Sequence, residues 1–430
     1  MDGSAATFDA GQQNSREFYK LTVTASTSDI SVALLTGGSD RPYVHGLTTA
    51  LSSRGIRLDL IGSDELDEPD LRNKPGVSFF KLRGDQRSDA NFTEKVFRIS
   101  KYYLKLVRYA ATAKPRIFHI LWNNKFQTLD RTVLMLYYKF LGKRVVLTAH
   151  NVNAGRRDST DTLLNRITLR IQYRLSDQVF VHTSKMKDEL SREFGVQRSR
   201  ITVIPFGINN SVPNTSLSSS EAKQRLGITD DKKTILFFGR ITPYKGLEYL
   251  VAAFRQLQSR CDDYRLLIVG RLEPGCEKYW DPIREVIQED VRMGRIFLRI
   301  EFIPDHETEI YFKGADVLVL PYKEIFQSGV LFLGYGFGLP VLVADVGSLK
   351  DEIVEGKTGF IFNPEDSADL ARTIDRYFAS DLFAGLNQRR QEIRDLAAEL
   401  HSWGVVGQRT IGVYAKVLRL PSPNEQPNRQ

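Results

Sequence analysis

Two basic side chains that follow an apolar run are of the types that bind a phosphorylated ligand. In the segment FFGRITPYKG, residues 237–246, Arg240 and Lys245 come just after a stretch that reads as a strand, with Gly239 at its end. Arginine holds two oxygens at once and lysine supplies a point charge, so the pair suits a diphosphate. We assign all three residues to one binding site. An exposed loop with two basic residues is the alternative.

A second phosphate feature lies in YKEIFQSGVLFLGYGFGLP, residues 322–340. A strand precedes it, a loop runs to Gln327, and an apolar helix is expected to start at about Ser328. Free amide groups and a partial positive charge make a helix N-terminus an anion site, with Ser328 as cap and Gly329 open to a ligand. The alternative is that Ser328 only caps a core helix. Three further glycines are expected to let the helix lie close to the sheet, at 334, 336 and 338.

The elements that must position these residues alternate between strands and helices. ISVALLTGG, residues 30–38, reads as a buried strand, VHGLTTALSSRG as a helix and IRLDLIG as the next strand. A polar stretch over 208–222 interrupts this pattern, which restarts at KTILFFGR. We therefore predict two Rossmann-like, doubly wound α/β domains whose strand ends face a central cleft. Further N-terminal strands are expected at 116–122, 144–150, 178–184 and 201–207.

Composition and charge indicate the cellular compartment and the kind of partner. The chain has 430 residues, a net charge of +8 and two cysteines, too few for a disulfide framework. No secretory leader and no membrane-spanning run is recognised, so we expect a cytoplasmic protein. Residues 81–200 carry +15, which leaves −7 for the rest of the chain. A basic block of this kind favours an anionic partner, with a solvated face of uneven charge as the alternative.

Several segments together resemble family 4 glycosyltransferases of the GT-B fold. VIPFGINN, ILFFGRITPYKGLEYLVAAF, LLIVG, ADVLVLPY and FGLPVLVADVGSLKDEIVEGKTGFIFNPED occur in the family's order through the C-terminal half. The N-terminal half is similar more loosely, in ISVALLTGGSDRPYVHGLTTALSSRG and VVLTAHNV. The resemblance implies a retaining hexosyltransferase that uses a nucleotide-sugar donor, with no cofactor and no tightly bound metal.

The resemblance also implies roles for single residues. The family's diphosphate-binding pair falls on Arg240 and Lys245, and its sugar-contacting histidine on His150. With Glu324, these residues form the expected catalytic set. Donor binding is expected from the first glycine-rich loop, the base-binding segment and the helix cradle, namely Gly37, Gly38, Gly239, Phe302, Ile303, Pro304, Gln327, Ser328, Gly329 and Val330.

One departure concerns the family's pair of glutamates, which are separated by seven residues. The second falls on Leu333, which accepts no hydrogen bond, and the first falls near Ile325. A loop shift of one residue brings Glu324 into the first role. Ribose recognition must then come from elsewhere in this QSGV variant. A catalytically inactive nucleotide-sugar-binding module is therefore the alternative to an enzyme. A nicotinamide-dependent oxidoreductase is disfavoured, because TGGSDRPYVHG lacks the G-x-G-x-x-G spacing.

The resemblance, taken with the charge pattern, gives expected domains and partners. UDP- or GDP-sugars are the expected donors, and a glycan or lipid-linked acceptor of envelope or exopolysaccharide synthesis the expected partner. Basic, apolar helices in the N-terminal half suit the inner face of an anionic membrane, whereas helices simply packed on the sheet are the alternative. No nucleic-acid motif accompanies the charge. The expected organisation is a disordered tail (1–28), an acceptor domain (29–210), a linker (211–225), a nucleotide-sugar domain (226–400), a helix that crosses back (401–420) and a disordered tail (421–430).

Overall fold

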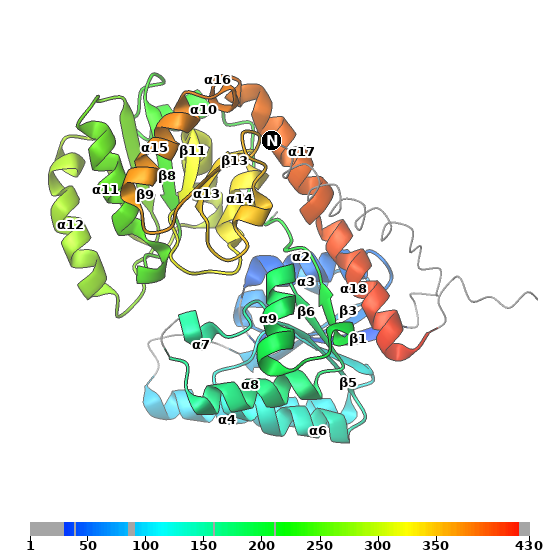
Figure 1. The fold of residues 1–430 in the computed structure, drawn as a ribbon. Helices are drawn as coiled ribbons and strands as arrows, with labels where there is room; N and C mark the ends of the chain where they lie inside the picture. Colours follow the sequence, from blue (N-terminus) through cyan, green and yellow to red (C-terminus); the bar gives the residue numbers. More distant parts are fainter. Residues whose placement is uncertain (1–29, 38–39, 85–90, 158–159, 210–211, 421–430) are drawn as a thin grey trace, which may run out of the picture.

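The computed structural model describes residues 30–37, 40–84, 91–157, 160–209 and 212–420, which form two α/β domains (Figure 1). Each domain is built on a parallel sheet, as the sequence predicts. The seven N-terminal strands are β1 (Ser31–Leu35), β2 (Arg57–Ser63), β3 (Val77–Gly84), β4 (Ile117–Ile120), β5 (Arg144–Thr148), β6 (Gln178–Val181) and β7 (Ile201–Val203). They pair in the order β3-β2-β1-β4-β5-β6-β7.

Six strands form the C-terminal sheet, in the order β10-β9-β8-β11-β12-β13. Their inner members are short apolar runs buried on both faces, which is typical of parallel sheets covered by helices. The strands are β8 (Lys233–Phe238), β9 (Tyr264–Val269), β10 (Ile296–Arg299), β11 (Val317–Leu320), β12 (Val341–Ala344) and β13 (Gly359–Phe362).

Helices cover both faces of the N-terminal sheet. Because side chains alternate along a strand, Val32 and Leu34 enter one core, whereas Ala33 and Leu35 enter the other. The first core lies under α2 (Arg41–Ser52) and α18 (Trp403–Leu418). The second lies under α4 (Phe92–Thr112), α6 (Met135–Phe140), α8 (Leu163–Leu175) and α9 (Ser184–Phe194). The remaining short turns are η2 (Asp64–Leu66), α3 (Pro69–Arg72), α5 (Gln127–Leu129), η3 (Asp130–Leu134), α7 (Ala154–Arg157) and η4 (Arg198–Arg200).

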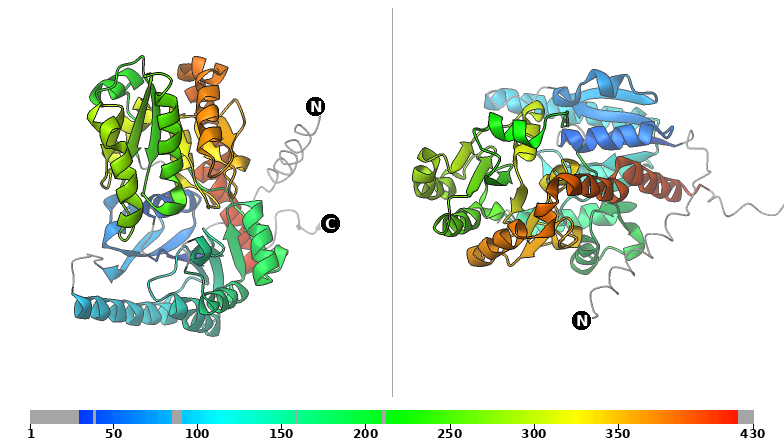
Figure 2. Two further views of the ribbon diagram at one scale, coloured as in Figure 1. Left: turned by 60° about the vertical axis from the view of Figure 1, so that its left-hand side comes forward. Right: turned by 90° about the horizontal axis from the view of Figure 1, so that it is seen from above.

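The C-terminal domain has a continuous apolar core of its own. It includes the sheet and the helices on both sides of it (Figure 2). The helical segments of this domain are α10 (Ser219–Arg225), η5 (Pro243–Lys245), α11 (Leu247–Gln258), α12 (Glu277–Arg292), α13 (Asp305–Gly314), α14 (Gly329–Gly336), η6 (Lys350–Glu352), α15 (Ser367–Phe378), α16 (Asp381–Ala384) and α17 (Leu386–His401).

The prediction of a linker over residues 211–225 is wrong for its second half. Residues 219–225 form α10, which packs on α13 and therefore belongs to the C-terminal domain. The helix starts with a capping box, in which Ser218 and Glu221 each accept a hydrogen bond from the backbone of the other. Lys223 then forms a buried ion pair with Asp316, 2.9 Å away. The predicted tails, 1–28 and 421–430, lie outside the described residues.

The last helices lead from the C-terminal domain back to the N-terminal one (Figure 1). α17 contacts α14, and α18 packs along α2. Trp403, the first residue of α18, donates a hydrogen bond from its indole nitrogen to the carbonyl of Ile208, 2.7 Å away. The chain therefore crosses between the domains twice, at adjacent places. Among the helices that the structure describes, none is both long enough and apolar enough to span a bilayer.

Candidate active site

The two phosphate features predicted from the sequence meet at Gly239. This residue follows β8 with φ of +108°, a left-handed conformation that favours glycine. A Cβ atom placed there would lie 2.7 Å from the ammonium nitrogen of Lys245 and 3.5 Å from a methyl group of Val330. The lysine after β8 and the first turn of α14 thus flank one point of the backbone. The structure brings these two segments together from about 85 residues apart.

Lys245 is a buried cation without a carboxylate partner among the described residues. It ends the short turn η5, and its ammonium group lies 5.3 Å from the centre of the Tyr322 ring. Burial, with a smaller effect from Arg240, lowers the pKa of Lys245 to about 7. No opposite charge in the described part of the chain offsets the cost of burying this ammonium group, so an anion that binds beside it is stabilised.

Arg240 stands at the mouth of the cleft and is largely exposed. Within the described residues its only ion pair is with Glu273, at 3.5 Å. It also lies near Asp40 of the N-terminal domain. Burial raises the pKa of Asp40, and the hydrogen bond from the Tyr43 amide and the charge of Arg240 oppose this rise. Arg240 therefore lies where it can meet a ligand between the two domains.

The start of α14 is close to the prediction, with one correction. The helix begins at Gly329, and Ser328 takes the cap position, but its hydroxyl makes no cap hydrogen bond. The Ser328 oxygen instead lies 3.3 Å from the hydroxyl of Tyr322. Within the described part of the chain, no capping side chain thus accepts from the first amides. Gly329 is exposed and Val330 is partly buried, so the helix end is accessible.

Of the three later glycines in this segment, only Gly334 fits the expected reason for its presence. A Cβ atom on Gly334 would lie 2.9 Å from Leu318 of the sheet, so glycine does allow close packing there. A Cβ atom on Gly336 would make only an ordinary contact, 3.6 Å from Ile208. Gly338 follows the helix with φ of +65°, a left-handed conformation that favours glycine.

Gln327 binds inward rather than toward the cleft. Its amide nitrogen donates to Glu352, 2.7 Å away, and its own oxygen is buried with no hydrogen-bond partner among the described residues. The other oxygen of Glu352 lies 3.2 Å from His401, which also contacts the carbonyl of Phe206 at 3.1 Å. A chain of polar contacts thus links the loop before α14 to the place where the backbone crosses between the domains.

His150 lies at the end of β5 inside an aromatic cluster. Its ring stacks on Trp122 with 4.1 Å between centres and meets Tyr43 edge-on at 4.8 Å. Burial, and secondly the neighbouring His182, lowers its pKa well below the usual value, so the ring is neutral at pH 7. His182 is also neutral, since burial lowers its pKa to about 4.

The hydrogen bonds of this histidine pair assign the tautomers. His182 Nδ1 lies 3.3 Å from the carbonyl of Ile204, which only accepts, so this nitrogen carries the proton. His182 Nε2 is then the acceptor of a 3.0 Å hydrogen bond from His150 Nδ1. His150 Nε2 is left as a bare acceptor. The Leu121 carbonyl lies near this ring, but Nε2 makes no hydrogen bond of good geometry within the described residues. Among the described residues this nitrogen is an unsatisfied acceptor, and it is itself buried.

The N-terminal glycine loop is described in part. Gly37 has φ of +61°, and a Cβ atom there would collide with the backbone of Trp122. Arg83 donates a hydrogen bond to its carbonyl. Gly38 lies outside the described residues. Asp40, just beyond, adopts φ of 39° and caps α2 by accepting from the amide of Tyr43.

The expected base-binding segment follows β10 at the edge of the C-terminal sheet. Phe302 is 69% exposed, Ile303 is buried, and Pro304 precedes α13. An exposed phenylalanine beside a buried isoleucine offers a ring surface for a base. Leu333, where the family has its second glutamate, is buried in the apolar core. It cannot hold a ribose hydroxyl.

Glu324 lies in the cleft, where both domains contribute walls. It lines a cavity of about 270 Å³ together with Glu189, Asn153 and Arg156 of the N-terminal domain. Burial and the nearby Glu193 raise the pKa of Glu189, and Glu324 adds to this across the cleft. Lys185 of α9 also donates to the carbonyl of Gly347, a direct contact between the domains.

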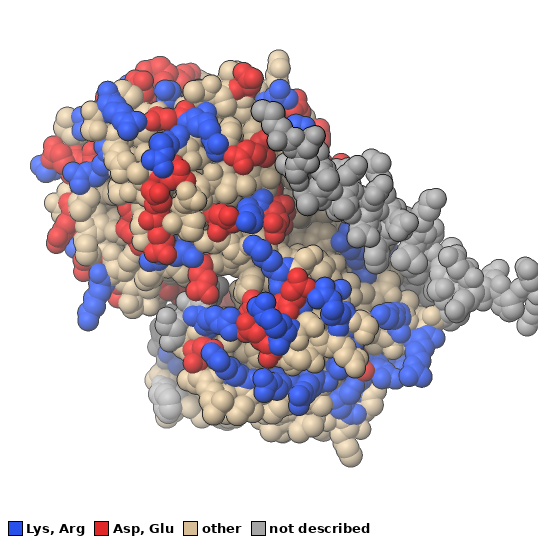
Figure 3. Space-filling view, in the orientation of Figure 1, with Lys and Arg blue, Asp and Glu red and all other residues tan. Residues whose placement is uncertain are grey.

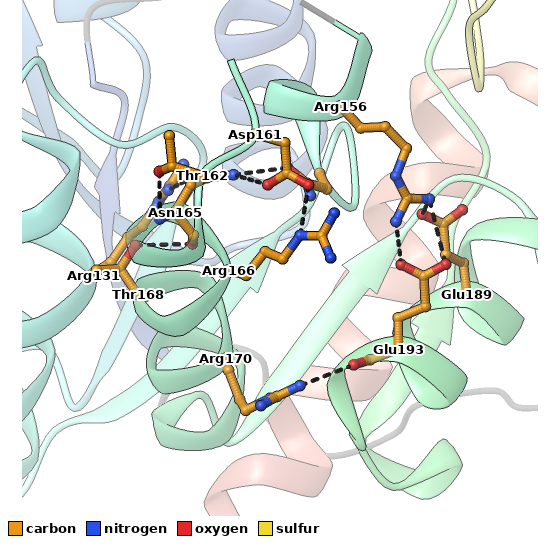
Figure 4. A network of polar contacts seen from close by, with 11 residues as sticks. Arg131, Arg156, Asp161, Thr162, Asn165, Arg166, Thr168, Arg170, Glu189 and Glu193 are labelled. Atoms are coloured by element: carbon orange, nitrogen blue, oxygen red, sulfur yellow. Dashed lines mark hydrogen bonds and ion pairs between the residues drawn. The ribbon is translucent and has the colours of Figure 1, made fainter. Parts of the chain in front are cut away.

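A second cavity of about 350 Å³ continues the cleft toward α8. Arg156 pairs there with Glu193 at 2.6 Å, and Arg166 pairs with Asp161 at 2.7 Å (Figure 4). Asn153 and Arg156 line both cavities, which joins them into one path. Its wall carries both donors, such as Arg166 and Arg170, and acceptors, such as Glu193 and Glu189. This pattern suits a polyhydroxyl ligand that both gives and receives hydrogen bonds.

Sequence reasoning missed several of these residues. Glu189, Arg156 and Asp40 enter the cleft from the N-terminal domain, and Glu352 supports the loop before α14. Asp40 carried a signal, because an Asp-x-Pro start after a glycine loop is typical of a helix cap. The others lie on segments without a distinctive local pattern.

Comparisons with known proteins agree with this geometry. The family model of glycosyl transferases group 1 matches residues 218–397, and that of glycosyltransferase family 4 matches residues 37–212. Together they span both domains, so this chain belongs to the family 4 glycosyltransferases and has the GT-B fold.

Individual relatives are distant. D-inositol 3-phosphate glycosyltransferase of Streptomyces avermitilis is 29% identical over 248 residues, which are 57% of this chain and 53% of that protein. The chain thus matches about half the length of this relative. An uncharacterized glycosyltransferase of Methanocaldococcus jannaschii is 28% identical over 86% of this chain and 93% of its own length.

Solved structures share the fold over most of the chain. Sucrose-phosphate synthase from Thermosynechococcus elongatus has a TM-score of 0.73 at 20% identity, covering 91% of this chain and all of that one. Anabaena HepE in complex with UDP and glucose has a TM-score of 0.68 at 15% identity, covering 90% of this chain and all of its own.

Proposed function

We propose that this protein transfers a sugar, with retention of configuration, from a UDP- or GDP-sugar to a glycan or lipid-linked acceptor. The observation that carries the proposal is the arrangement around Gly239, where an unpaired buried lysine meets the open end of α14. Both groups bind the same kind of ligand, a diphosphate. HepE, which was solved with UDP and glucose, has the same fold and favours UDP as the first donor to test.

The proposed reaction breaks the bond between the sugar C1 and the diphosphate oxygen, which leaves with the electron pair. Lys245, Arg240 and the first amides of α14 stabilise the negative charge on the leaving group. The acceptor oxygen attacks C1 from the side of the leaving group, and its proton passes to a diphosphate oxygen. His150 Nε2 accepts a hydrogen bond from a sugar hydroxyl, and Glu324 lies against the donor sugar. No metal is proposed, since these cations already face the diphosphate.

The setting of the reaction is also a proposal. Cys261 and Cys276 are both free thiols, which suits a reducing cytoplasm. The acceptor is proposed to belong to cell-envelope or exopolysaccharide synthesis at the inner face of a membrane. The S. avermitilis relative is named for D-inositol 3-phosphate, so a phosphorylated cyclitol belongs in the acceptor screen.

Binding of the donor is tested first, by thermal shift with UDP, GDP, ADP and their sugar conjugates. A bound nucleotide raises the melting temperature by mass action. We expect a rise with one nucleotide that is lost in Arg240→Ala and in Lys245→Ala. Lys278→Ala, an exposed lysine of α12, is the matched control and keeps the rise. If no nucleotide shifts the wild type at millimolar concentration, the donor site is refuted.

Catalysis is tested separately from binding. His150→Phe keeps the stacking on Trp122 but removes the acceptor nitrogen, so we expect the nucleotide shift to remain and the transfer rate to fall by about 10- to 100-fold. NMR of the anomeric proton in the product checks retention. A wild type that binds nucleotide but neither transfers nor hydrolyses the sugar is the inactive binding module instead.

A further inference from the structure

A layer of three helices on the N-terminal domain exposes an unusual number of apolar side chains. We define the three-helix layer as α4, the α5–η3–α6 segment with its cap Phe126, and α8. Of the fourteen large apolar side chains exposed in the described part of the chain, ten belong to this layer. They are Val96, Phe97, Leu104, Phe126, Val133, Leu136, Phe140, Leu163, Leu164 and Ile167.

In α4 the exposed apolar residues alternate with cations along one stripe. Phe97, Lys101, Leu104 and Arg108 follow a spacing of four, three and four residues, which keeps them on one face. Leu104 is 72% exposed, whereas the opposite stripe packs three tyrosines and Leu106 into the core. Helix packing on the sheet therefore explains the buried face of α4 and leaves the outer face unexplained.

The other two helices repeat the pattern beside α4. In α8, Leu163, Ile167, Arg170 and Arg174 have the same spacing of four, three and four. At the end of α6, Phe140 is 87% exposed, the largest value among the exposed apolar side chains. The hydroxyl of Tyr137 donates to a carbonyl of α4, and α6 contacts α8, so the three helices lie side by side.

The charge of the three-helix layer equals that of the whole protein. Its three segments, 92–112, 126–140 and 163–175, hold ten Lys and Arg and two Asp and Glu, a net +8 against +8 for the full chain. Figure 3 shows Lys and Arg along the lower part of the N-terminal domain with uncharged residues between them, whereas both signs mix on the other domain. The net charge of the rest of the chain is therefore zero.

We propose that the three-helix layer is the surface by which this protein docks onto an anionic lipid bilayer. Protruding Phe and Leu side chains enter the acyl boundary while Lys and Arg bind the headgroups. A second copy of the chain is a poor occupant, since two basic surfaces repel each other. Nucleic acid fits badly, because its phosphates offer nothing to the apolar side chains.

The position of the layer deepens the proposed function, on which this step rests. The layer lies on the side of the N-terminal domain away from the C-terminal domain (Figure 1). Arg166 and Arg170 of α8 line one cavity, which shares Asn153 and Arg156 with the cavity of Glu324. A lipid-linked acceptor held in the docked bilayer therefore has a polar path from the headgroup region to the cleft.

Vesicle sedimentation of the full chain tests the docking surface. Vesicles of phosphatidylglycerol and phosphatidylcholine in equal parts are compared with pure phosphatidylcholine. We expect binding to the anionic vesicles only. Leu104→Ser combined with Phe140→Ser lowers the partition coefficient by at least about tenfold, because both side chains leave water in the bound state. Val286→Ser with Met293→Ser, two exposed apolar residues of the C-terminal domain, is the matched control and leaves it unchanged.

The charge contribution is tested in the same assay. Lys101→Gln with Lys105→Gln is expected to weaken binding about tenfold at low salt and less at high salt, since salt screens surface charge. Lys278→Gln with Arg292→Gln, on the other domain, serves as control. Circular dichroism checks that every variant is folded, which is expected because all the changed side chains are exposed.

Two results would overturn the docking proposal. One is equal binding of the wild type and the layer variants to anionic vesicles. The other is self-association of the wild type, seen by sedimentation velocity and lost in the Leu104 and Phe140 variant without any vesicle binding, which would assign the layer to a second copy. Neither result depends on nucleotide binding, so failure here and failure of the proposed transferase are distinguishable.

Discussion

At the scale of single residues, Lys245 is a group whose burial opposes folding. Its pKa of about 7 lies below the ordinary 10.5, so between pH 7 and 10 the unfolded chain binds more protons than the folded one. The free energy of unfolding therefore rises with pH across this window. Below pH 7 the cost of burying the charged lysine is present in full. An anion at the ammonium group offsets this cost. Lys245 is thus better explained by binding than by structure.

Replacing this lysine is expected to stabilise the free protein. Lys245→Met removes the charge and keeps the length of the side chain, so we predict a gain of about 1–3 kcal/mol in unfolding free energy at pH 6. Urea denaturation at pH 6 and pH 9 measures it, and the gain shrinks at the higher pH. Lys278→Met, at an exposed position, should change neither value. A loss of stability in Lys245→Met at pH 6 would contradict this account.

The same lysine makes nucleotide binding sensitive to pH. Above pH 7 the free Lys245 is partly neutral, and a diphosphate favours its charged form, so binding takes up a proton and weakens as pH rises. Calorimetry of UDP binding at pH 8 in buffers of different ionisation enthalpy measures this uptake. In Lys245→Arg, whose side chain stays charged, the heat should no longer depend on the buffer. Equal dependence in both proteins would point to another group.

At the scale of elements, the loop before α14 depends on a residue 25 positions further on. Glu352 accepts from Gln327 at 2.7 Å and faces His401 at 3.2 Å. Glu352→Ala leaves the half-buried Gln327 amide without its acceptor, so we predict about tenfold weaker nucleotide binding. Glu352→Gln, which still offers an oxygen, should restore most of the affinity. Titration calorimetry with UDP measures both.

A control separates this positioning role from a loss of stability. Glu355 lies only three residues after Glu352 and forms an exposed ion pair with Arg376. Glu355→Ala removes this ion pair and should leave nucleotide affinity unchanged. Melting temperatures of all three variants are measured without ligand. If Glu352→Ala lowers the melting temperature but binds UDP as the wild type does, Glu352 is structural and does not position the loop.

The elements were more predictable from sequence than the contacts among them. Short apolar runs followed by glycine or histidine mark strands such as β5 and β8, because both faces of a parallel sheet are buried. α10 was misread as linker although its Ser218 and Glu221 spacing is a helix-start signal. The meeting of Lys245 with α14 follows from the order of parallel strands. The hydrogen bond of Gln327 to Glu352 and the approach of Glu189 to Glu324 depend on tertiary packing, which no local pattern encodes.

At the scale of the whole molecule, one tryptophan joins the last helix to the first domain. Trp403 fits between Gly46 of α2 and Gly207, where a Cβ atom on either glycine would collide with its ring. The N-terminal core includes α18, whereas the C-terminal core is complete without it. The stability of the N-terminal domain therefore depends on a segment that follows the other domain in the chain.

Displacing Trp403 should uncouple the two domains. Gly46→Ala forces the ring out of its place at a cost of about 1–3 kcal/mol, carried by the N-terminal domain. We predict that scanning calorimetry then shows two transitions where the wild type shows one. UDP should raise the upper transition only, because Lys245 and α14 lie in the C-terminal domain. Gly404→Ala is the matched control, since a Cβ atom there would make only ordinary contacts at 3.6 Å. A single transition in Gly46→Ala that UDP shifts as a whole would show that the domains are held together mainly across the cleft, by contacts such as Lys185 with Gly347, and that α18 contributes little.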